Sequence, residues 1–188
     1  MRVATVILHA ARSTERSANV YSLLGAIPGA RVLVDEDGSG EARIGVKRGC
    51  WPSARRAWSL PALDDETHRL VLEDDAHLCD RFVELAREAI ERAPHAAISY
   101  FRGARGCSVA TSIPVALLPE WLAWAEIEAT RTPHHDLMIA MGMRELARDH
   151  FYTRPSLVEH GPLPSLLGHG ELRADYFERS ATSFSLER

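Results

Sequence analysis

The sequence predicts a single α/β domain with a mostly parallel central sheet flanked by helices. Short runs of β-branched and apolar residues alternate along the chain with longer segments whose apolar residues recur at helical spacing. The chain has 188 residues, of which 46% are hydrophobic and 26% are charged. This composition is typical of a soluble globular protein, and the length is enough for one domain with a full core.

The first elements are a strand, a helix and a second strand. Residues 3–8 (VATVIL) are β-branched and apolar, and they predict a strand at the centre of the sheet. Residues 17–26 carry an apolar helical stripe that ends before Pro28 and Gly29, and residues 31–34 predict the next strand. A strand, a helix and a strand in succession predict parallel pairing of the two strands.

The remaining chain continues this alternation of strands and helices. We expect strands at residues 70–73, 96–101, 108–113 and 155–158, and helices at residues 52–60, 79–92, 114–128 and 136–148. We assign residues 1–168 to the domain. Residues 169–188 are polar and weakly patterned, so we interpret them as a C-terminal tail or lid.

Composition and charge limit the partners and the setting of the protein. No apolar run approaches the roughly 20 residues that a membrane-spanning helix needs, so we expect no membrane span. The net charge of −4 argues against a general nucleic-acid binder, although residues 42–62 hold five basic residues and no acid. The three cysteines form neither a zinc spacing nor a disulfide framework, which favours a cytoplasmic location.

An acidic strand end is the most informative motif of the chain. The apolar residues 70–72 (LVL) lead directly into Glu73, Asp74 and Asp75. Because three ionised carboxylates cannot be buried without partners, we expect the strand to end at Glu73 with the two aspartates at the mouth of a crevice. Clustered carboxylates suit a divalent cation that in turn binds a diphosphate. The alternative is a solvated acidic turn that caps the following helix.

Two motifs together resemble the GT-A glycosyltransferases, which use nucleotide-sugar donors. The segment LEDDA at residues 72–76 is similar to their DXD-type signature, in the EDD form of the lipopolysaccharide glycosyltransferases and branching N-acetylglucosaminyltransferases. The segment PSLVEHGPLPSLLG at residues 155–168 resembles the His-Gly-Ser segment that closes many GT-A domains, although here the glycine directly follows His160. The resemblance implies a single GT-A (Rossmann-like) domain that transfers a sugar to an acceptor hydroxyl.

The resemblance also implies a metal ion, Mn²⁺ or Mg²⁺, on the diphosphate of the donor. Asp75 is the implied metal ligand, and His160 would add an imidazole, which favours manganese over magnesium. Glu73 or Asp74 would face the ribose or a metal-bound water. A UDP-sugar is the expected donor, and the acceptor is a glycan, a protein or a modified DNA base. For His160 the alternative is a strand-end histidine whose hydrogen bonds are satisfied within the fold.

Candidates for donor binding follow the first two predicted strands. His9 and Arg12 come after the first strand, and Asp35 comes after the second, where the resemblance implies contact with the nucleotide base. Arg48 and Arg55 are further candidates for contact with the diphosphate. The alternative for Asp35 is a turn-forming role, and for Arg12 an exposed loop position.

Asp136 is the candidate general base of an inverting transfer, which must remove a proton from the acceptor hydroxyl. It stands at the start of a predicted apolar helix, so the alternative is an N-cap of that helix. With Asp136 as a cap, a retaining mechanism is the more plausible one. His134 and His135 are alternates for the base.

Three other functional hypotheses stay open. A nucleotidyltransferase shares the sheet and the acidic metal site, but residues 9–16 lack the glycines of its phosphate-binding loop. A non-catalytic nucleotide-binding module of the same fold would bind the nucleotide without loss of the sugar. A nucleic-acid-associated protein would use the basic segment at residues 43–56 with Arg102 and Arg105, and a transferase acting on modified DNA bases would need the same residues.

Overall fold

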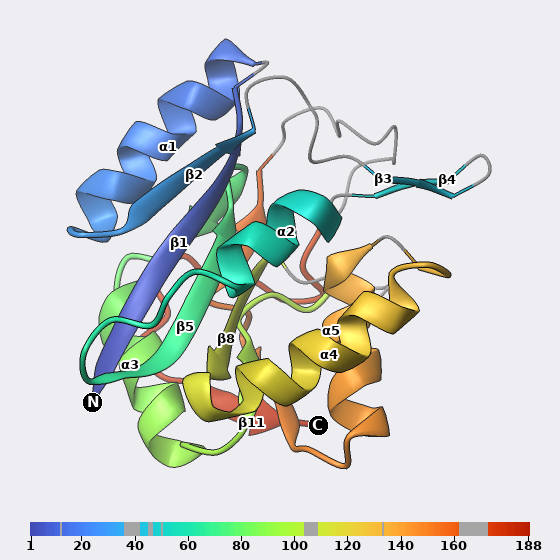
Figure 1. The fold of residues 1–188 in the computed structure, drawn as a ribbon. Coiled ribbons are helices and arrows are strands. Elements are labelled where there is room, and N and C mark those ends of the chain that lie inside the picture. Colours follow the sequence, from blue (N-terminus) through green and yellow to red (C-terminus); the bar gives the residue numbers. More distant parts are fainter. Residues whose placement is uncertain are drawn as a thin grey trace.

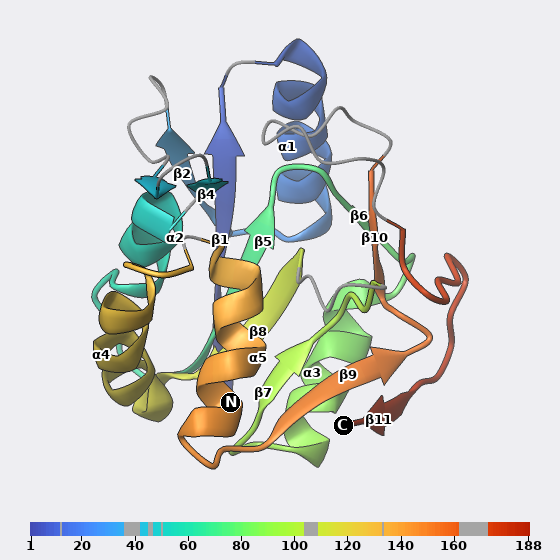
Figure 2. The same cartoon turned by 90° about the vertical axis from the view of Figure 1, so that its right-hand side faces the viewer.

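The computed structural model describes residues 1–11, 13–35, 42–44, 47–49, 51–103, 109–132, 134–161 and 173–188. In this part of the chain, seven strands form a central sheet with helices on both faces (Figures 1 and 2). The strands of this sheet are β1 (Arg2–Ala10), β2 (Arg31–Asp35), β5 (Glu66–Glu73), β7 (Ala97–Ser99), β8 (Ala110–Pro114), β9 (His150–Arg154) and β11 (Ser185–Glu187).

The other elements are five α-helices, one short 3-10 helix and two small two-stranded sheets. The helices are α1 (Thr14–Ala26), α2 (Trp51–Trp58), α3 (Phe82–Arg92), η1 (Val115–Leu117), α4 (Leu118–Glu128) and α5 (His135–Glu145). The small sheets pair β6 (Ala76–Leu78) with β10 (Val158–His160), and β3 (Ala42–Ile44) with β4 (Lys47–Gly49). None of the described helices is long and apolar enough to cross a membrane.

The central sheet is mixed, with the strand order β11-β9-β7-β8-β5-β1-β2. Five of its seven strands (β2, β1, β5, β7 and β9) run in one direction, whereas β8 and β11 run in the opposite direction. The predicted α/β class is therefore confirmed, with β8 as an antiparallel strand in the middle of the sheet. Strands β1, β2 and β5 end side by side, and we call this side of the sheet its carboxyl edge.

Alternate residues of the central strands face opposite layers of helices. Ile7 and Leu72 pack in a core with residues of α1 and α3, whereas Val6 and Val71 pack in a second core with residues of α2, α4 and α5. Because both faces of the sheet are covered, the strands are apolar without alternation, which is the pattern that the sequence shows.

The chain that follows α5 differs from the prediction. In place of one strand at residues 155–158, the chain forms β9 before this segment and β10 at its end. Strand β9 lacks an apolar run because most of its residues are only half-buried. The described part of the expected tail or lid, residues 173–188, contains β11, which pairs with β9 at the border of the sheet.

A buried ion pair joins β5 to the end of α2. The Arg69 guanidinium donates to both carboxylate oxygens of Glu66, from Nε at 2.9 Å and from Nη2 at 3.1 Å, and it also donates to the carbonyl of Trp58 at 2.9 Å. The two side chains are 1% and 0% exposed. Arg69 therefore satisfies the carbonyl of the last residue of α2, in a region that water does not reach.

We expect Glu66→Gln to lower the free energy of unfolding by about 3 kcal/mol, because the amide leaves the buried guanidinium without a counter-charge. Urea denaturation measures this difference. The matched control is Glu88→Gln, whose ion pair with Arg92 is nearly half exposed and whose loss should cost less than about 1 kcal/mol. Equal losses in the two variants would contradict the structural role of the buried pair.

Candidate functional site

The acidic strand end lies at the carboxyl edge, beside the end of β1. Glu73 is the last residue of β5, as predicted, and it pairs in register with Leu8 of β1. The chain then turns through Asp74 and Asp75 into β6. The side-chain amide of Asn19, on α1, donates to the carbonyl of Asp74 at 2.9 Å and thereby holds this turn.

Asp74 is enclosed by donors from β1 and α1. Its Oδ2 accepts a hydrogen bond from the backbone N–H of Ala10 at 2.8 Å and lies 2.9 Å from Nδ1 of His9. Its Oδ1 accepts from the guanidinium of Arg16. Asp74 is only 3% exposed, and the N–H of Ala10 and the guanidinium of Arg16 replace the water contacts that its carboxylate loses on burial.

Asp75 connects α1 to the distant strand β10. Its Oδ2 lies 2.7 Å from Nη2 of Arg16 and 3.3 Å from Nε2 of His160. Its Oδ1 is buried and has no hydrogen-bond partner among the described residues. The site thus keeps one carboxylate oxygen that a cation or a ligand donor can satisfy.

The expected position of the two aspartates at the mouth of a crevice is wrong, because both side chains are buried. The expectation assumed that the carboxylates have no counter-charge within the fold, but Arg16 pairs with both. The alternative of a helix cap also fails, because α3 begins only at Phe82, with Arg81 at the N-cap position.

Arg16 is the functional candidate that the sequence analysis missed. It is only 6% exposed and bridges Asp74 and Asp75. Burial disfavours its charged form, but the attraction of the two carboxylates outweighs burial and raises the pKa of the guanidinium above its ordinary value. The site therefore holds a permanent positive charge between its two acids.

The sequence contains a pattern that predicts the burial of Arg16. Helix α1 begins at Thr14 with Ser13 as its N-cap, three residues earlier than predicted. With this start, Arg16 falls on the same helical stripe as the buried residues Val20 and Leu23. A charged residue on a buried stripe must have a partner, and in the structure Asp74 and Asp75 provide it.

Hydrogen bonding fixes the tautomer of His160. Its Nδ1 lies 2.9 Å from the carbonyl oxygen of Gly161, which can only accept, so Nδ1 carries a proton. The Nε2 that faces Asp75 then carries either a second proton or a lone pair. If Nε2 carries a second proton, the imidazolium of His160 forms an ion pair with the carboxylate of Asp75. If Nε2 carries a lone pair, the two side chains attract each other only through a cation bound between them.

The glycine that directly follows His160 has a structural reason. The N–H of Gly161 donates to the carbonyl of Asp75 at 2.7 Å, and a Cβ at this position would lie 2.8 Å from the same oxygen. It would also lie 2.9 Å from Nε2 of His77. Only a residue without a side chain allows β10 to approach β6 this closely, as Figure 2 shows for the two strands.

We expect Gly161→Ala to separate β10 from the turn at Asp75 and to destabilise the protein by about 2 kcal/mol, because the clash is with backbone. The same change should move His160 away from Asp75. Chemical denaturation measures the first effect, and the side-chain NMR signals of His160 report the second. Gly25→Ala is the control, because its Cβ would meet no atom within 4 Å. Unchanged His160 signals would contradict the positioning role of Gly161.

The other predicted site residues are placed as follows. His9 belongs to the site, and Glu73 is half-buried at its border. Asp35 ends β2 at the carboxyl edge, where it pairs in register with Ala10. Asp136 lies in the first turn of α5, and the N-cap position belongs to His134.

Three predictions fall outside the described residues in whole or in part. Arg12 lies outside them, and so do the side chains of Arg48 and Asp136. Arg55 is described, and it forms an ion pair with Glu126 of α4. The diphosphate contacts predicted for Arg12 and Arg48 and the catalytic role of Asp136 therefore stay predictions.

Two of the described residues have the chemistry of metal ligands, Asp75 and His160. The described residues contain no group of three histidine, cysteine or acidic side chains arranged to hold a metal ion. Asp75 and His160 nevertheless fit as two ligands, because one carboxylate oxygen has no partner and the Nε2 of the imidazole faces this carboxylate. The phosphates of a bound nucleotide would supply the remaining oxygen ligands that a divalent cation needs.

Comparison of the sequence with models of known protein families gives no match, and comparison with curated proteins gives none either.

Proposed function

We propose that this protein is a metal-dependent glycosyltransferase of the GT-A type, which transfers a sugar from a nucleotide-diphosphate donor to an acceptor hydroxyl. The observation that carries this proposal is the contact between Asp75 and His160, at 3.3 Å. The two residues are far apart in the sequence, and each belongs to one of the two motifs that resemble this family. Their meeting beside the ends of β1 and β5 supports the proposal, because both residues are candidate ligands of one metal ion.

The residues of the site suit the departure of a diphosphate. Asp75 and His160 would hold Mn²⁺ or Mg²⁺, which supplies a Lewis acid for the negative charge that develops on the leaving group. Arg16 offsets the charge of the two aspartates, so the site does not repel an incoming diphosphate as strongly as two unpaired acids would. His9 fixes the orientation of Asp74.

The remaining parts of the proposal rest on the sequence. Asp136 is the proposed base that removes the acceptor proton, which makes the transfer inverting. A UDP-sugar is the proposed donor, and Asp35, at the end of β2, is the proposed contact for its base. The acceptor is a hydroxyl of a glycan, a protein or a modified DNA base.

Release of the nucleotide from a panel of sugar nucleotides tests the proposal. We expect one donor to be cleaved in the presence of Mn²⁺ and left intact when the metal is chelated. Binding of a sugar nucleotide without cleavage, with every acceptor class present, would show a non-catalytic binding module. Formation of a sugar nucleotide from a nucleoside triphosphate and a sugar phosphate would show a nucleotidyltransferase.

A further inference from the structure

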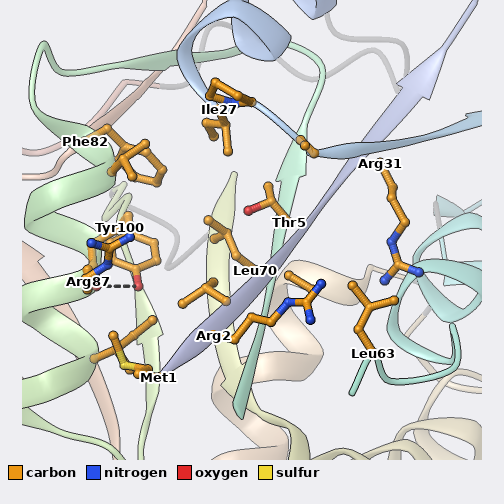
Figure 3. Close-up of a pocket in the computed structure, with 18 residues that line it drawn as sticks. Met1, Arg2, Thr5, Ile27, Arg31, Leu63, Leu70, Phe82, Arg87 and Tyr100 are labelled. Atoms are coloured by element: carbon orange, nitrogen blue, oxygen red, sulfur yellow. Dashed lines mark hydrogen bonds between the residues drawn. The ribbon is translucent and has the colours of Figure 1, made fainter. Parts of the chain in front are cut away.

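A cavity lies away from the acidic site, at the amino end of β1. Its volume is about 400 Å³. The start of β1, the turn between α1 and β2, and one side of α3 form its walls (Figure 3). None of the residues of the acidic site lines it. The cavity is therefore separate from the proposed transfer site.

The cavity exists because β2 is shorter than its neighbour. Strand β1 pairs with β5 from Arg2 onward, but it pairs with β2 only from Val6 onward. Among the described residues, the first four residues of β1 have no strand beside them on the side of β2. The chain turns at Pro28 and Gly29 above this open side and leaves the space unfilled.

The lining of the cavity combines apolar and basic side chains. Figure 3 shows the rings of Phe82 and Tyr100 on one side, with Arg87 beside Tyr100. The side chains of Arg2 and Arg31 lie near Leu63 on the other side. Among the described residues that line the cavity are three arginines (Arg2, Arg31 and Arg87) and no acid. In a protein with a net charge of −4, this is a local excess of positive charge.

Arg31 has the strongest need for a partner in this cavity. Its Nε and Nη2 are buried and have no hydrogen-bond partner among the described residues. Arg2, in contrast, pairs with Asp65 at 2.7 Å. Buried donors of a charged group are costly to leave unsatisfied, and the most effective partner for a guanidinium is a carboxylate or a phosphate.

We propose that this cavity binds a small amphipathic anion, whose carboxylate or phosphate group pairs with Arg31 and whose apolar body packs against Ile27, Leu70 and Phe82. The volume lies within the range of about 300–1,000 Å³ that is typical of small-molecule sites. Such sites combine an apolar lining with a few polar groups that orient the ligand, and this cavity has both. The proposal does not depend on the proposed transferase activity.

Titration with three probes tests this site. Decanoate carries both features of the ligand, 1-decanol carries the apolar body alone, and inorganic phosphate carries the charge alone. We expect decanoate to bind with a dissociation constant below about 1 mM, and each of the other probes to bind at least about tenfold more weakly. Amide NMR shifts at residues 2–5 and 27–31 locate the binding. Absence of decanoate binding, or equal binding of 1-decanol, overturns the proposal.

Two variants and a matched control assign the binding to the cavity. Arg31→Gln should weaken decanoate binding about tenfold without loss of stability, because it removes a guanidinium whose Nε and Nη2 have no hydrogen-bond partner among the described residues. Val83→Glu places an acid at the 40% exposed rim of the cavity and should weaken binding by repulsion. Arg144→Gln, on the exposed surface of α5, should leave binding unchanged. Unchanged affinity in Arg31→Gln, or equal loss in Arg144→Gln, overturns the assignment.

Discussion

Replacement of Arg16 with methionine is expected to lower the free energy of unfolding by about 4 kcal/mol. The variant leaves Asp74 and Asp75 as adjacent carboxylates that are 3% and 2% exposed, without the cation that bridges them. Methionine fills a similar volume, so the loss reports charge and hydrogen bonding more than packing. Urea denaturation at neutral pH measures the change.

A second variant of Arg16 separates the role of its charge from that of its shape, and an exposed arginine provides the control. Arg16→Lys keeps the charge but cannot bond to two carboxylates in the same way, so we expect about half of the loss. Arg144→Met, at an exposed position, should change stability by less than about 0.5 kcal/mol. Mn²⁺ should restore part of the stability of Arg16→Met, because a bound cation would replace the missing charge. Full stability of Arg16→Met without metal would show that the aspartates do not need Arg16.

Replacement of Asp75 with asparagine is expected to reduce donor cleavage about 1,000-fold, which corresponds to about 4 kcal/mol of transition-state stabilisation. The amide keeps the size of the side chain but removes the negative charge that would hold the metal ion. The variant should have a lower kcat/KM for donor cleavage than the wild type. A high Mn²⁺ concentration should restore only a small part of this difference. Steady-state assays over a range of Mn²⁺ concentrations measure both quantities.

Asp80→Asn is the matched control for Asp75→Asn. Its carboxylate is 60% exposed and pairs with Arg179 on the surface, close in sequence to the site but outside it. We expect its activity to equal that of the wild type within a factor of two. Retention of more than a tenth of the activity by Asp75→Asn would mean that this carboxylate does not act at the reacting centre.

The central part of the fold follows from local patterns in the sequence. The β-branched run of β1, the apolar stripe of α1 and the acidic stop at Glu73 each depend on residues close together in the chain. Hydrophobic periodicity detects such elements. The carboxyl edge, with His9, Asp35 and Glu73 at the ends of three strands, could therefore be predicted before its geometry was known.

The parts of the fold and of the site that the sequence did not predict depend on contacts between distant segments. Strands β6 and β10 have three residues each, too few for a periodic pattern, and they are stabilised by pairing with each other across the chain. Arg16 was missed because a helix start placed at residue 17 left it in a loop. The cavity at the amino end of β1 arises from the unequal pairing of β1 with its two neighbours, which no local pattern encodes.

The most direct test of the proposed donor site is a thermal-shift panel of UDP, GDP, CMP and TDP, each with and without Mn²⁺. A ligand that binds only the folded state raises the melting temperature by mass action. We predict that one nucleotide, UDP by preference, raises the melting temperature only with Mn²⁺, and that Asp75→Ala abolishes the shift. Absence of a shift with every nucleotide and metal would contradict the account, and the buried network of Arg16, Asp74 and Asp75 would then be a structural element alone.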